Sequence, residues 1–245
     1  MARKSTSRVT NANNDVKHDP PKTLEDHPFF GMKLDEEQAV FRDAIWDDKY
    51  AAVFVDSKAG TGKTTIAVAT AMLLVEYGKF SGMVYVTAGG VHEYKQGLLP
   101  GSLEEKSAPL FIPLYQAVAR LGYDPQRIII SDYNMLGQKD GTALITAMTD
   151  SYVRGMSIGE HGSPVVVLFD EIQNLTVSGI KTLLSRVNDG SKIICIGHQG
   201  QVDLKYPQDS GFSRALERYK KEDWCKVCTL SKNYRGKISM VADEL

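Results

Sequence analysis

A phosphate-binding loop pattern at residues 57–64 constrains the fold of this chain more than any other feature. The letters SKAGTGKT fit the spacing GxxxxGK followed by Ser or Thr, except that Ser57 stands at the first glycine position. An apolar run, 51–55, precedes the loop, and a helical run, 66–75, follows it. A glycine-rich turn without a ligand is the alternative, but the complete order of strand, loop and helix favours a phosphate cradle.

Each residue type in the loop predicts one part of a Mg²⁺-ATP site. Backbone N–H groups and the positive end of the following helix would surround a β-phosphate, and Gly60 and Gly62 would allow the tight curl. Lys63 would bridge the β- and γ-phosphates, Thr64 would offer its hydroxyl to Mg²⁺, and Thr65 would lie by the α-phosphate. The predicted nucleotide-binding residues of the loop are Ser57, Lys58, Ala59, Gly60, Thr61, Gly62, Lys63, Thr64 and Thr65.

A second candidate site follows the apolar run 165–169, which has no polar alternation and is typical of a parallel strand buried on both faces. Asp170 and Glu171 come directly after it. Ligands of parallel α/β sheets bind at the carboxyl ends of strands, so these acids should face the phosphates. We expect Asp170 to hold Mg²⁺ through a water and Glu171 to polarise the attacking water. The alternative is an acidic pair that only begins a surface turn.

Another buried strand is expected at 192–196, with a polar stretch, 197–201, after it. The Gln201 amide could hydrogen-bond the γ-phosphate or the attacking water and so sense hydrolysis. His198 is expected to be structural or solvent-facing rather than a base or metal ligand. Arg235 is the best candidate for a guanidinium that neutralises transition-state charge, although a surface arginine is the more common case.

Gln38 is a candidate contact for the adenine base. It lies just inside a helical pattern that begins at Leu34 and carries acids in its first turn. A glutamine amide donates and accepts at once, which suits the N6 and N7 edge of adenine. An ordinary surface glutamine is the alternative.

Length and composition favour a water-soluble α/β protein. The chain has 245 residues and a formal net charge of −1, so overall charge does not argue for a nucleic-acid partner. No apolar stretch is long enough to span a bilayer, and the N-terminus lacks a signal core, so we expect no membrane association and a cytoplasmic location. Residues 1–22 are predicted to form a disordered basic polar tail, either solvated or in contact with nucleic acid, and 23–245 a single domain.

Three cysteines suit a reducing compartment. Cys225 and Cys228 have CxxC spacing, but in a strand they would point to opposite faces, so we expect buried structural thiols rather than a zinc site.

The remaining pattern predicts alternating helices and strands, hence a three-layer α/β fold with a mostly parallel central sheet. Further strands are expected at 83–86, 127–130 and 226–230, and further helices at 102–120, 213–221 and after 236, with a weaker helix at 142–152.

From Leu34 to the C-terminus the chain resembles the PhoH family, P-loop ATPases related to the first core domain of superfamily 1 helicases. The resemblance rests on AGTGKTT (59–65), GLLPG (97–101), EK (105–106), YVRG (152–155), DEIQN (170–174), GxxxQVDL (197–204) and SG (210–211). It implies a RecA-like fold and ring-like homo-oligomers. The segment 230–235 resembles the helicase motif whose arginine approaches the γ-phosphate, which supports the transition-state role of Arg235. The resemblance also supports Gln38 as the residue that contacts adenine.

Three positions depart from the family pattern. Ser57 replaces a glycine, His198 stands where aspartate is usual, and Thr87-Ala88 stands where Arg-Pro is usual, a loss that would weaken a nucleic-acid contact. Some relatives carry an N-terminal ribonuclease domain, which the short polar tail does not match, so no nuclease activity is expected.

The combined motifs favour a Mg²⁺-dependent ATPase that acts on, or is regulated by, RNA or single-stranded DNA. One alternative is an ATP-driven helicase motor. Superfamily 1 helicases clamp nucleotide between two core domains, and this chain has room for one, so such a motor would have to be an oligomer. A second alternative is a nucleotide-sensing interaction module, against which the intact Asp170-Glu171 pair argues, since a pure binder does not need Glu171.

Overall fold

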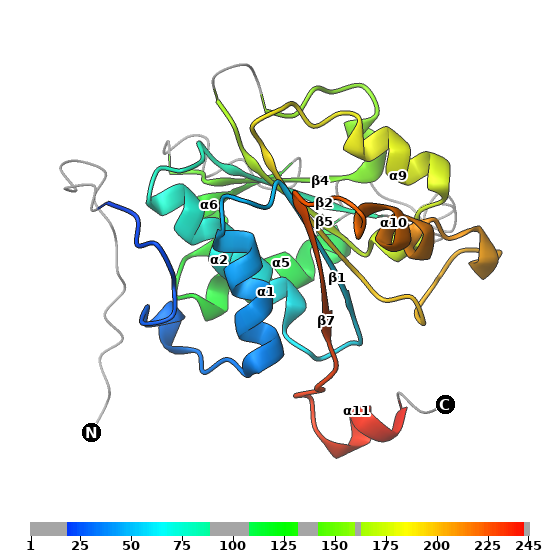
Figure 1. Ribbon diagram of the computed structural model, residues 1–245, viewed down its shortest axis with the longest axis horizontal. Helices are drawn as coiled ribbons and strands as arrows, with labels where there is room; N and C mark the ends of the chain where they lie inside the picture. The colour runs from blue at the N-terminus through cyan, green and yellow to red at the C-terminus, as the bar shows by residue number, and fades with distance from the viewer. Residues whose placement is uncertain (1–18, 89–107, 132–141, 160–162, 243–245) are drawn as a thin grey trace.

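The computed structural model describes residues 19–88, 108–131, 142–159 and 163–242 (Figure 1). Most of the predicted tail and the GLLPG motif therefore lie outside the described residues, as does the start of the helix predicted at 102–120.

A seven-stranded sheet forms the centre of the molecule, and all of its strand pairs are parallel, so the predicted three-layer α/β class with a mostly parallel central sheet is confirmed. The strand order is β3-β4-β2-β5-β6-β1-β7, which places β6 between the P-loop strand β1 and the acid-bearing strand β5. The strands are β1 (Ala52–Ser57), β2 (Met83–Thr87), β3 (Ile129–Ile130), β4 (Ile145–Thr149), β5 (Val166–Asp170), β6 (Lys192–Gly197) and β7 (Cys225–Leu230).

Helices cover both faces of the sheet (Figure 1). One face carries α1 (Glu36–Trp46), α2 (Lys63–Glu76), α5 (Ile112–Arg120) and α6 (Pro125–Ile128). The other carries α8 (Asp150–Val153), α9 (Val177–Leu184) and α10 (Phe212–Tyr219). The last helix, α11 (Lys237–Ala242), stands apart from these layers, and short 3-10 turns occur at η1 (Phe29–Gly31), η2 (Ala108–Phe111), η3 (Ile172–Asn174) and η4 (Pro207–Asp209).

The sequence pattern of β1 explains how it joins the two cores. Val53 and Val55 pack into the core under α1 and α2, while Ala52 and Phe54 pack into the core under α9 and α10. Side chains alternate between the faces of a strand, so a run that is apolar at every position must be covered on both sides. The strand that carries the P-loop is therefore fixed from both faces.

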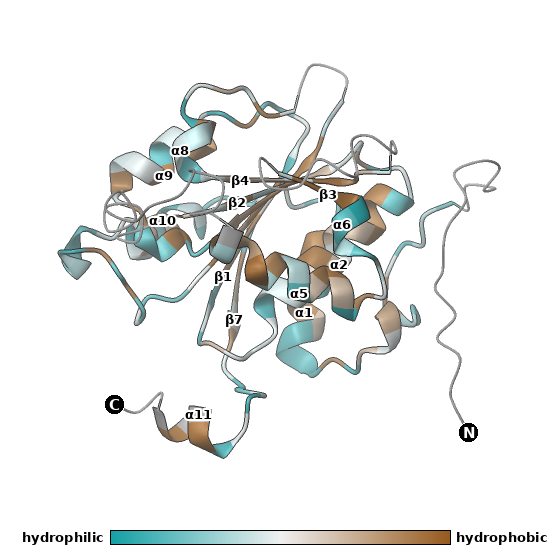
Figure 2. Cartoon of the chain, turned by 180° about the vertical axis from the view of Figure 1, so that it is seen from behind, coloured by the Kyte–Doolittle hydropathy of each residue, from teal (hydrophilic) through white to brown (hydrophobic). Residues whose placement is uncertain are grey.

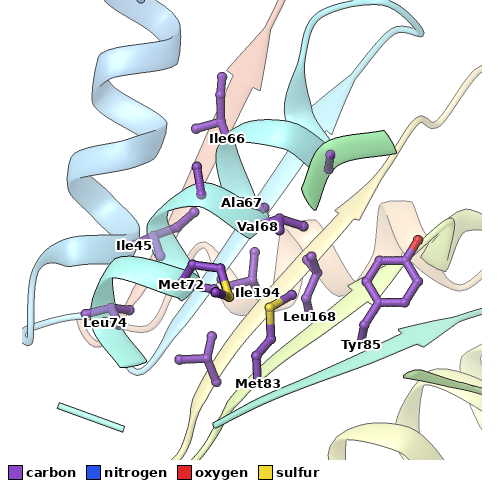
Figure 3. Close-up of a cluster of buried hydrophobic side chains, with 14 of the residues drawn as sticks. Ile45, Ile66, Ala67, Val68, Met72, Leu74, Met83, Tyr85, Leu168 and Ile194 are labelled. Atoms are coloured by element: carbon purple, nitrogen blue, oxygen red, sulfur yellow. The ribbon is translucent and has the colours of Figure 1, made fainter. Parts of the chain in front are cut away.

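Helix α2 lies at the centre of the first core. Every side chain from Ile66 to Leu74 is buried, so the helix is apolar all round rather than amphipathic. Its side chains meet residues of α1, β2, β5 and β6, among them Ile45, Met83, Leu168 and Ile194 (Figure 3). Figure 2 shows hydrophobic colouring along α2 and the central strands. This packing holds the first turn of α2, and with it the end of the P-loop, against the sheet.

Two predicted elements differ from the structure. The helix predicted at 142–152 is wrong: 145–149 form strand β4 between β2 and β3, and only 150–153 are helical. Pairing on both sides overrides the weak helical pattern, and three of the five residues in 145–149 are β-branched. Of the strand predicted at 127–130, only 129–130 pair, because Asp124 caps a short helical turn that begins at Pro125.

The predicted arrangement of the CxxC cysteines is confirmed. Cys225 packs in the core under α9 and α10, and Cys228 in the core on the opposite face of the sheet. Burial raises the pKa of Cys225 to about 12 and that of Cys228 to about 11, so both remain thiols at neutral pH. Within the described ranges, no helix has the length and apolarity required to cross a bilayer.

Candidate functional site

The P-loop connects the carboxyl end of β1 to the amino end of α2. Gly60 (φ 78°) and Gly62 (φ 84°) both adopt left-handed conformations, and α2 begins at Lys63 directly after Gly62. A Cβ atom at Gly60 would lie 2.6 Å from Asn233 Oδ1 and 2.9 Å from Arg235 Cγ. Both glycines are therefore required by backbone conformation, and Gly60 also by the close approach of the segment after β7.

The backbone conformation at position 57 does not require glycine. It is the last residue of β1, and among the described non-glycine residues only Phe29, Phe30 and Glu171 have positive φ. The buried Ser57 hydroxyl accepts a hydrogen bond from Thr61 Oγ1 at 3.2 Å, which closes the loop from inside. The departure from the family pattern at Ser57 therefore leaves the loop conformation intact.

The P-loop hydroxyl and the acid at the end of β5 meet as the sequence predicts. Thr64 Oγ1 donates to Asp170 Oδ2 at 3.2 Å, although 106 positions separate the two residues. The Lys63 ammonium lies along the loop and donates to the carbonyl oxygens of Ser57 (3.2 Å) and Lys58 (3.4 Å). A threonine hydroxyl and a carboxylate are hard oxygen ligands of the kind Mg²⁺ prefers, so these residues fit the predicted metal.

Asp170 lies in an unusual environment for a carboxylate. Its side chain is buried, and burial followed by the charge of Glu171 raises its pKa to about 6, against the opposing effects of the Tyr85 hydrogen bond and the Lys63 charge. Tyr85 OH donates to Asp170 Oδ2 at 2.8 Å from the neighbouring strand β2. Burial and then the Asp170 charge raise the pKa of Tyr85 well above its usual value, so the phenol stays a donor.

Glu171 follows with a strained backbone. Its φ and ψ of 55° and 33° are left-handed, which is unfavourable for a residue with a long side chain. Its backbone N–H donates to Asp170 Oδ1 at 2.9 Å, and its carboxylate accepts from Gln173 Nε2 at 2.6 Å. Strain of this kind is typical of functional positions, where the surrounding structure holds one side chain in one place.

The loop after β6 comes to the site through its backbone. The carbonyl of Gln201 accepts from Gln173 Nε2 at 3.1 Å, but the Gln201 side chain is exposed and shows no hydrogen bond to another described residue. Its role as a sensor therefore stays a prediction. The His198 ring lies with Nδ1 3.4 Å from Asp56 Oδ1, and Asp56 also accepts from the backbone N–H of Gln199 at 3.1 Å.

The segment after β7 lies against the P-loop. The Tyr234 N–H donates to the Gly60 carbonyl at 2.9 Å, and the Tyr234 hydroxyl donates to Asp35 at the start of α1. The hydrogen bond to Asp35 is the main cause that raises the pKa of Tyr234. Ser231 donates from both N–H and hydroxyl to the Glu37 carboxylate, at 2.7 and 2.9 Å. These contacts bring the exposed Arg235 beside the loop, with its aliphatic part over Gly60, and its role in neutralising transition-state charge stays a prediction.

Gln38 is buried, so the alternative of an ordinary surface glutamine is wrong. Its Nε2 donates to the Thr61 carbonyl at 2.9 Å, and its Oε1 accepts from the Asp35 N–H at 3.1 Å in a capping box. The side chain thus joins α1 to the P-loop. Contact with adenine stays a prediction.

Two side chains at the site carried no predicted role. Tyr85 belongs to an apolar strand, and its contact with Asp170 depends on which strands are neighbours, which the residue pattern does not state. Gln173 stands in the family-specific DEIQN stretch, and that placement was the only available signal of its function. Asn174 beside it holds the same loop, since its Oδ1 accepts from the Asp203 N–H at 2.8 Å.

Solved structures that match part of this chain include a Pif1 helicase from Bacteroides in complex with ADP-AlF3 and ssDNA. That likeness has a TM-score of 0.41 and 17% identity, and covers 84% of this chain and 44% of the other. The Sulfolobus solfataricus SWI2/SNF2 ATPase core matches with a TM-score of 0.42 and 12% identity over 76% of this chain and 36% of that one.

Sequence relatives include Protein PhoH2 of Bacillus subtilis (strain 168), which is 29% identical over 91% of this chain and 49% of its own length. Protein PhoH of Escherichia coli (strain K12) is 28% identical over 74% of this chain and 48% of its own. The chain thus spans about half the length of these relatives. Residues 32–241 match the family model described as PhoH-like protein. With this match over most of its length, the chain belongs to the PhoH family.

Proposed function

We propose that the protein hydrolyses ATP in a Mg²⁺-dependent reaction. The observation that carries this proposal is the 3.2 Å contact between Thr64 Oγ1 and Asp170 Oδ2, which joins the P-loop to the acidic end of β5. Glu171 extends the same acidic pair, and a protein that only binds nucleotide does not need it. The geometry therefore favours hydrolysis over nucleotide sensing.

In the proposed mechanism, Lys63 and the backbone N–H groups of the P-loop bind the phosphates, and Thr64 and Asp170 hold the metal ion. When bound there, Mg²⁺ would neutralise negative charge on the phosphate oxygens. Glu171 orients the attacking water and accepts its proton. Arg235, held beside Gly60, stabilises negative charge that develops on the γ-phosphoryl group.

The direct test is phosphate release by the purified chain with ATP, with and without Mg²⁺. We expect Lys63→Ala to abolish binding of a fluorescent ATP analogue, and Glu171→Gln to bind the analogue normally while hydrolysis falls by about 10²-fold or more. An equal rate for wild type and Glu171→Gln would show that Glu171 is not the base. No phosphate release by the wild type would favour the nucleotide-sensing module instead.

We further propose that RNA or single-stranded DNA is the partner of this ATPase, on the basis of the resemblance to superfamily 1 helicase cores. The expected result is faster ATP hydrolysis with single-stranded RNA or DNA, together with binding that weakens as salt rises. An unchanged rate with both nucleic acids would contradict this part of the proposal and leave the ATPase standing.

The assembly belongs to the same proposal. The PhoH resemblance implies a homo-oligomer, and a mass measurement in solution tests it. Unwinding of a duplex by the oligomer would favour the helicase alternative over regulation by nucleic acid. The three free, buried cysteines suit a reducing compartment, so we place the activity in the cytoplasm.

A further inference from the structure

We propose that Gln173 is a positioning residue that fixes the Glu171 carboxylate relative to the loop after β6. The inference rests on the proposed ATP hydrolysis and adds a residue to it. Gln173 lies in the turn η3, two positions after Glu171, and its side chain is 1% exposed. Its side chain hydrogen-bonds both to the acidic pair at the end of β5 and to the polar loop at the end of β6.

All hydrogen-bonding groups of the Gln173 amide are used. Nε2 donates to Glu171 Oε2 at 2.6 Å and to the Gln201 carbonyl at 3.1 Å, and Oε1 accepts from the His198 N–H at 3.2 Å. A glutamine amide has two N–H donors and one carbonyl oxygen, so this set leaves no donor free. Only one orientation of the amide satisfies a carboxylate, a carbonyl and an N–H at these places.

The amide also packs closely against the end of β6. A Cβ atom at Gly197 would lie 2.7 Å from Gln173 Oε1 and 3.1 Å from Ile172 Cγ2, so the end of β6 must be glycine for the amide to fit. Ser210 Oγ donates to the Gln173 backbone carbonyl at 2.7 Å and fixes the turn from the other side. The amide is therefore held before any ligand arrives.

Glu171 depends on this contact for its orientation. Its backbone is left-handed, and a glutamate side chain has several rotamers of similar energy. The short, charge-assisted hydrogen bond from Gln173 selects one of them. A displacement of about 1 Å at a reacting group can lower a rate by about 10²-fold, so a fixed carboxylate matters for the chemical step more than for nucleotide binding.

A purely structural role is the competing explanation, because Gln173 also anchors the loop. Asn174 provides a matched control for that role. It is the next residue of the same turn, it is buried, and its amide oxygen accepts from the Asp203 N–H of the same loop. Among the described residues, the Asn174 side chain makes no hydrogen bond to Glu171, whereas its backbone N–H donates to the Glu171 carbonyl at 3.0 Å, a bond that Asn174→Ala retains. A change at Asn174 thus weakens the loop anchor and leaves the carboxylate contact in place.

The experiment compares Gln173→Met, which keeps the size of the side chain but removes its donors, with Asn174→Ala. For each we would measure single-turnover ATP hydrolysis, the affinity for a fluorescent ATP analogue and the melting temperature. We expect Gln173→Met to lower the hydrolysis rate about 10- to 100-fold with affinity unchanged within about twofold, and Asn174→Ala to stay within about threefold of wild type. An equal loss in both variants, or none in Gln173→Met, would overturn the proposal.

A double variant tests whether Gln173 acts through Glu171. Adding Gln173→Met to Glu171→Gln should lower the residual rate by less than about twofold, since the group being positioned is already gone. A full further loss in the double variant would contradict the proposal.

If Gln173→Met does not fold, Gln173→Glu replaces it. This variant keeps an oxygen for the His198 N–H but places a carboxylate where the donor to Glu171 was, and we expect at least the same loss of rate. An inactive wild type would refute the ATPase and this inference together, whereas an active wild type with a fully active Gln173→Met variant would refute the inference alone.

Discussion

Within the P-loop and the acidic pair, positive φ occurs at Gly60, Gly62 and Glu171. The two glycines adopt this conformation without a steric penalty, whereas Glu171 does not, so its strain must be offset by the contacts around it. The two kinds of position therefore call for different substitutions. Glycines are tested by adding a methyl group, and Glu171 by changing the group that holds it.

Gly60→Ala is expected to weaken nucleotide binding at least tenfold. The added Cβ would lie 2.6 Å from Asn233 Oδ1, so the segment after β7 or the loop itself must shift. Gly31→Ala is the matched control, since Gly31 has a similar φ of 75° and no heavy atom within 4 Å of the added Cβ. Both variants should lose about 1–2 kcal/mol of unfolding free energy from the left-handed alanine. Only Gly60→Ala should lose affinity for a fluorescent ATP analogue, and equal affinities would contradict this account.

Lys192 gives a prediction on stability and pH. It is buried at the start of β6, donates to the Asp47 carbonyl at 2.7 Å, and has a pKa lowered to about 8 from 10.5, mainly by burial. Below pH 8 the folded state contains a buried ammonium, whereas above pH 10.5 the amine is neutral in both folded and unfolded chains. The penalty for burying the charge is therefore full below pH 8 and disappears as pH rises to 10.5.

Lys192→Met should accordingly be more stable than wild type at pH 7, by about 2 kcal/mol once the lost hydrogen bond is allowed for. The difference should shrink between pH 8 and 10.5, as measured by urea unfolding. Lys49→Met, a change of an exposed lysine near the same end of the sheet, should show no such trend. If the stability difference between Lys192→Met and wild type grew with pH, the prediction would be contradicted.

Among the elements, the segment after β7 has the most direct influence on the P-loop, because it contacts both the loop and the first turn of α1. Glu37 accepts two hydrogen bonds from Ser231, and Tyr234 donates to the Gly60 carbonyl three residues later. The position of Arg235 thus depends on α1, which lies far away in the sequence.

Glu37→Ala should therefore lower the ATP hydrolysis rate several-fold by loosening the segment that carries Arg235. Glu36→Ala is the control, since Glu36 lies in the same helical turn and is exposed. Each variant loses one acid near the helix amino end, so helix stability changes by a similar few tenths of a kcal/mol. Equal hydrolysis rates in the two variants would show that the Ser231 contact does not influence the site.

Short continuous apolar runs that end in polar residues predicted β1, β5 and β6, because a strand buried on both faces lacks polar alternation. The motifs and the rule for strand ends then predicted that Thr64 and Asp170 meet. The pattern did not predict β4, whose identity comes from its two neighbours in the sheet. Nor did it predict the Gln173 contacts, because the orientation of one amide is decided by three partners, Glu171 after β5 and His198 and Gln201 in the loop after β6.

For the molecule as a whole, ligand binding should appear as thermal stabilisation. ATP with Mg²⁺ at about 100 times its dissociation constant adds about 2.7 kcal/mol to the free energy of unfolding. In a chain of this size that corresponds to a rise in melting temperature of roughly 5–10 °C. Dye-monitored melting should show the rise for wild type and none for Lys63→Ala. An equal rise in Lys63→Ala would place the nucleotide elsewhere.

The sheet order also has a consequence for how the protein is made. Strand β1, at residues 52–57, pairs in the sheet with β6 at 192–197 and β7 at 225–230. At about 5–20 residues per second, the ribosome makes β1 on the order of ten seconds before either neighbour exists. Until then both edges of the apolar strand before the P-loop lack their partner strands. Substitutions that weaken β6 or β7 should therefore reduce the yield of soluble protein during synthesis before they reduce the activity of the molecules that do fold.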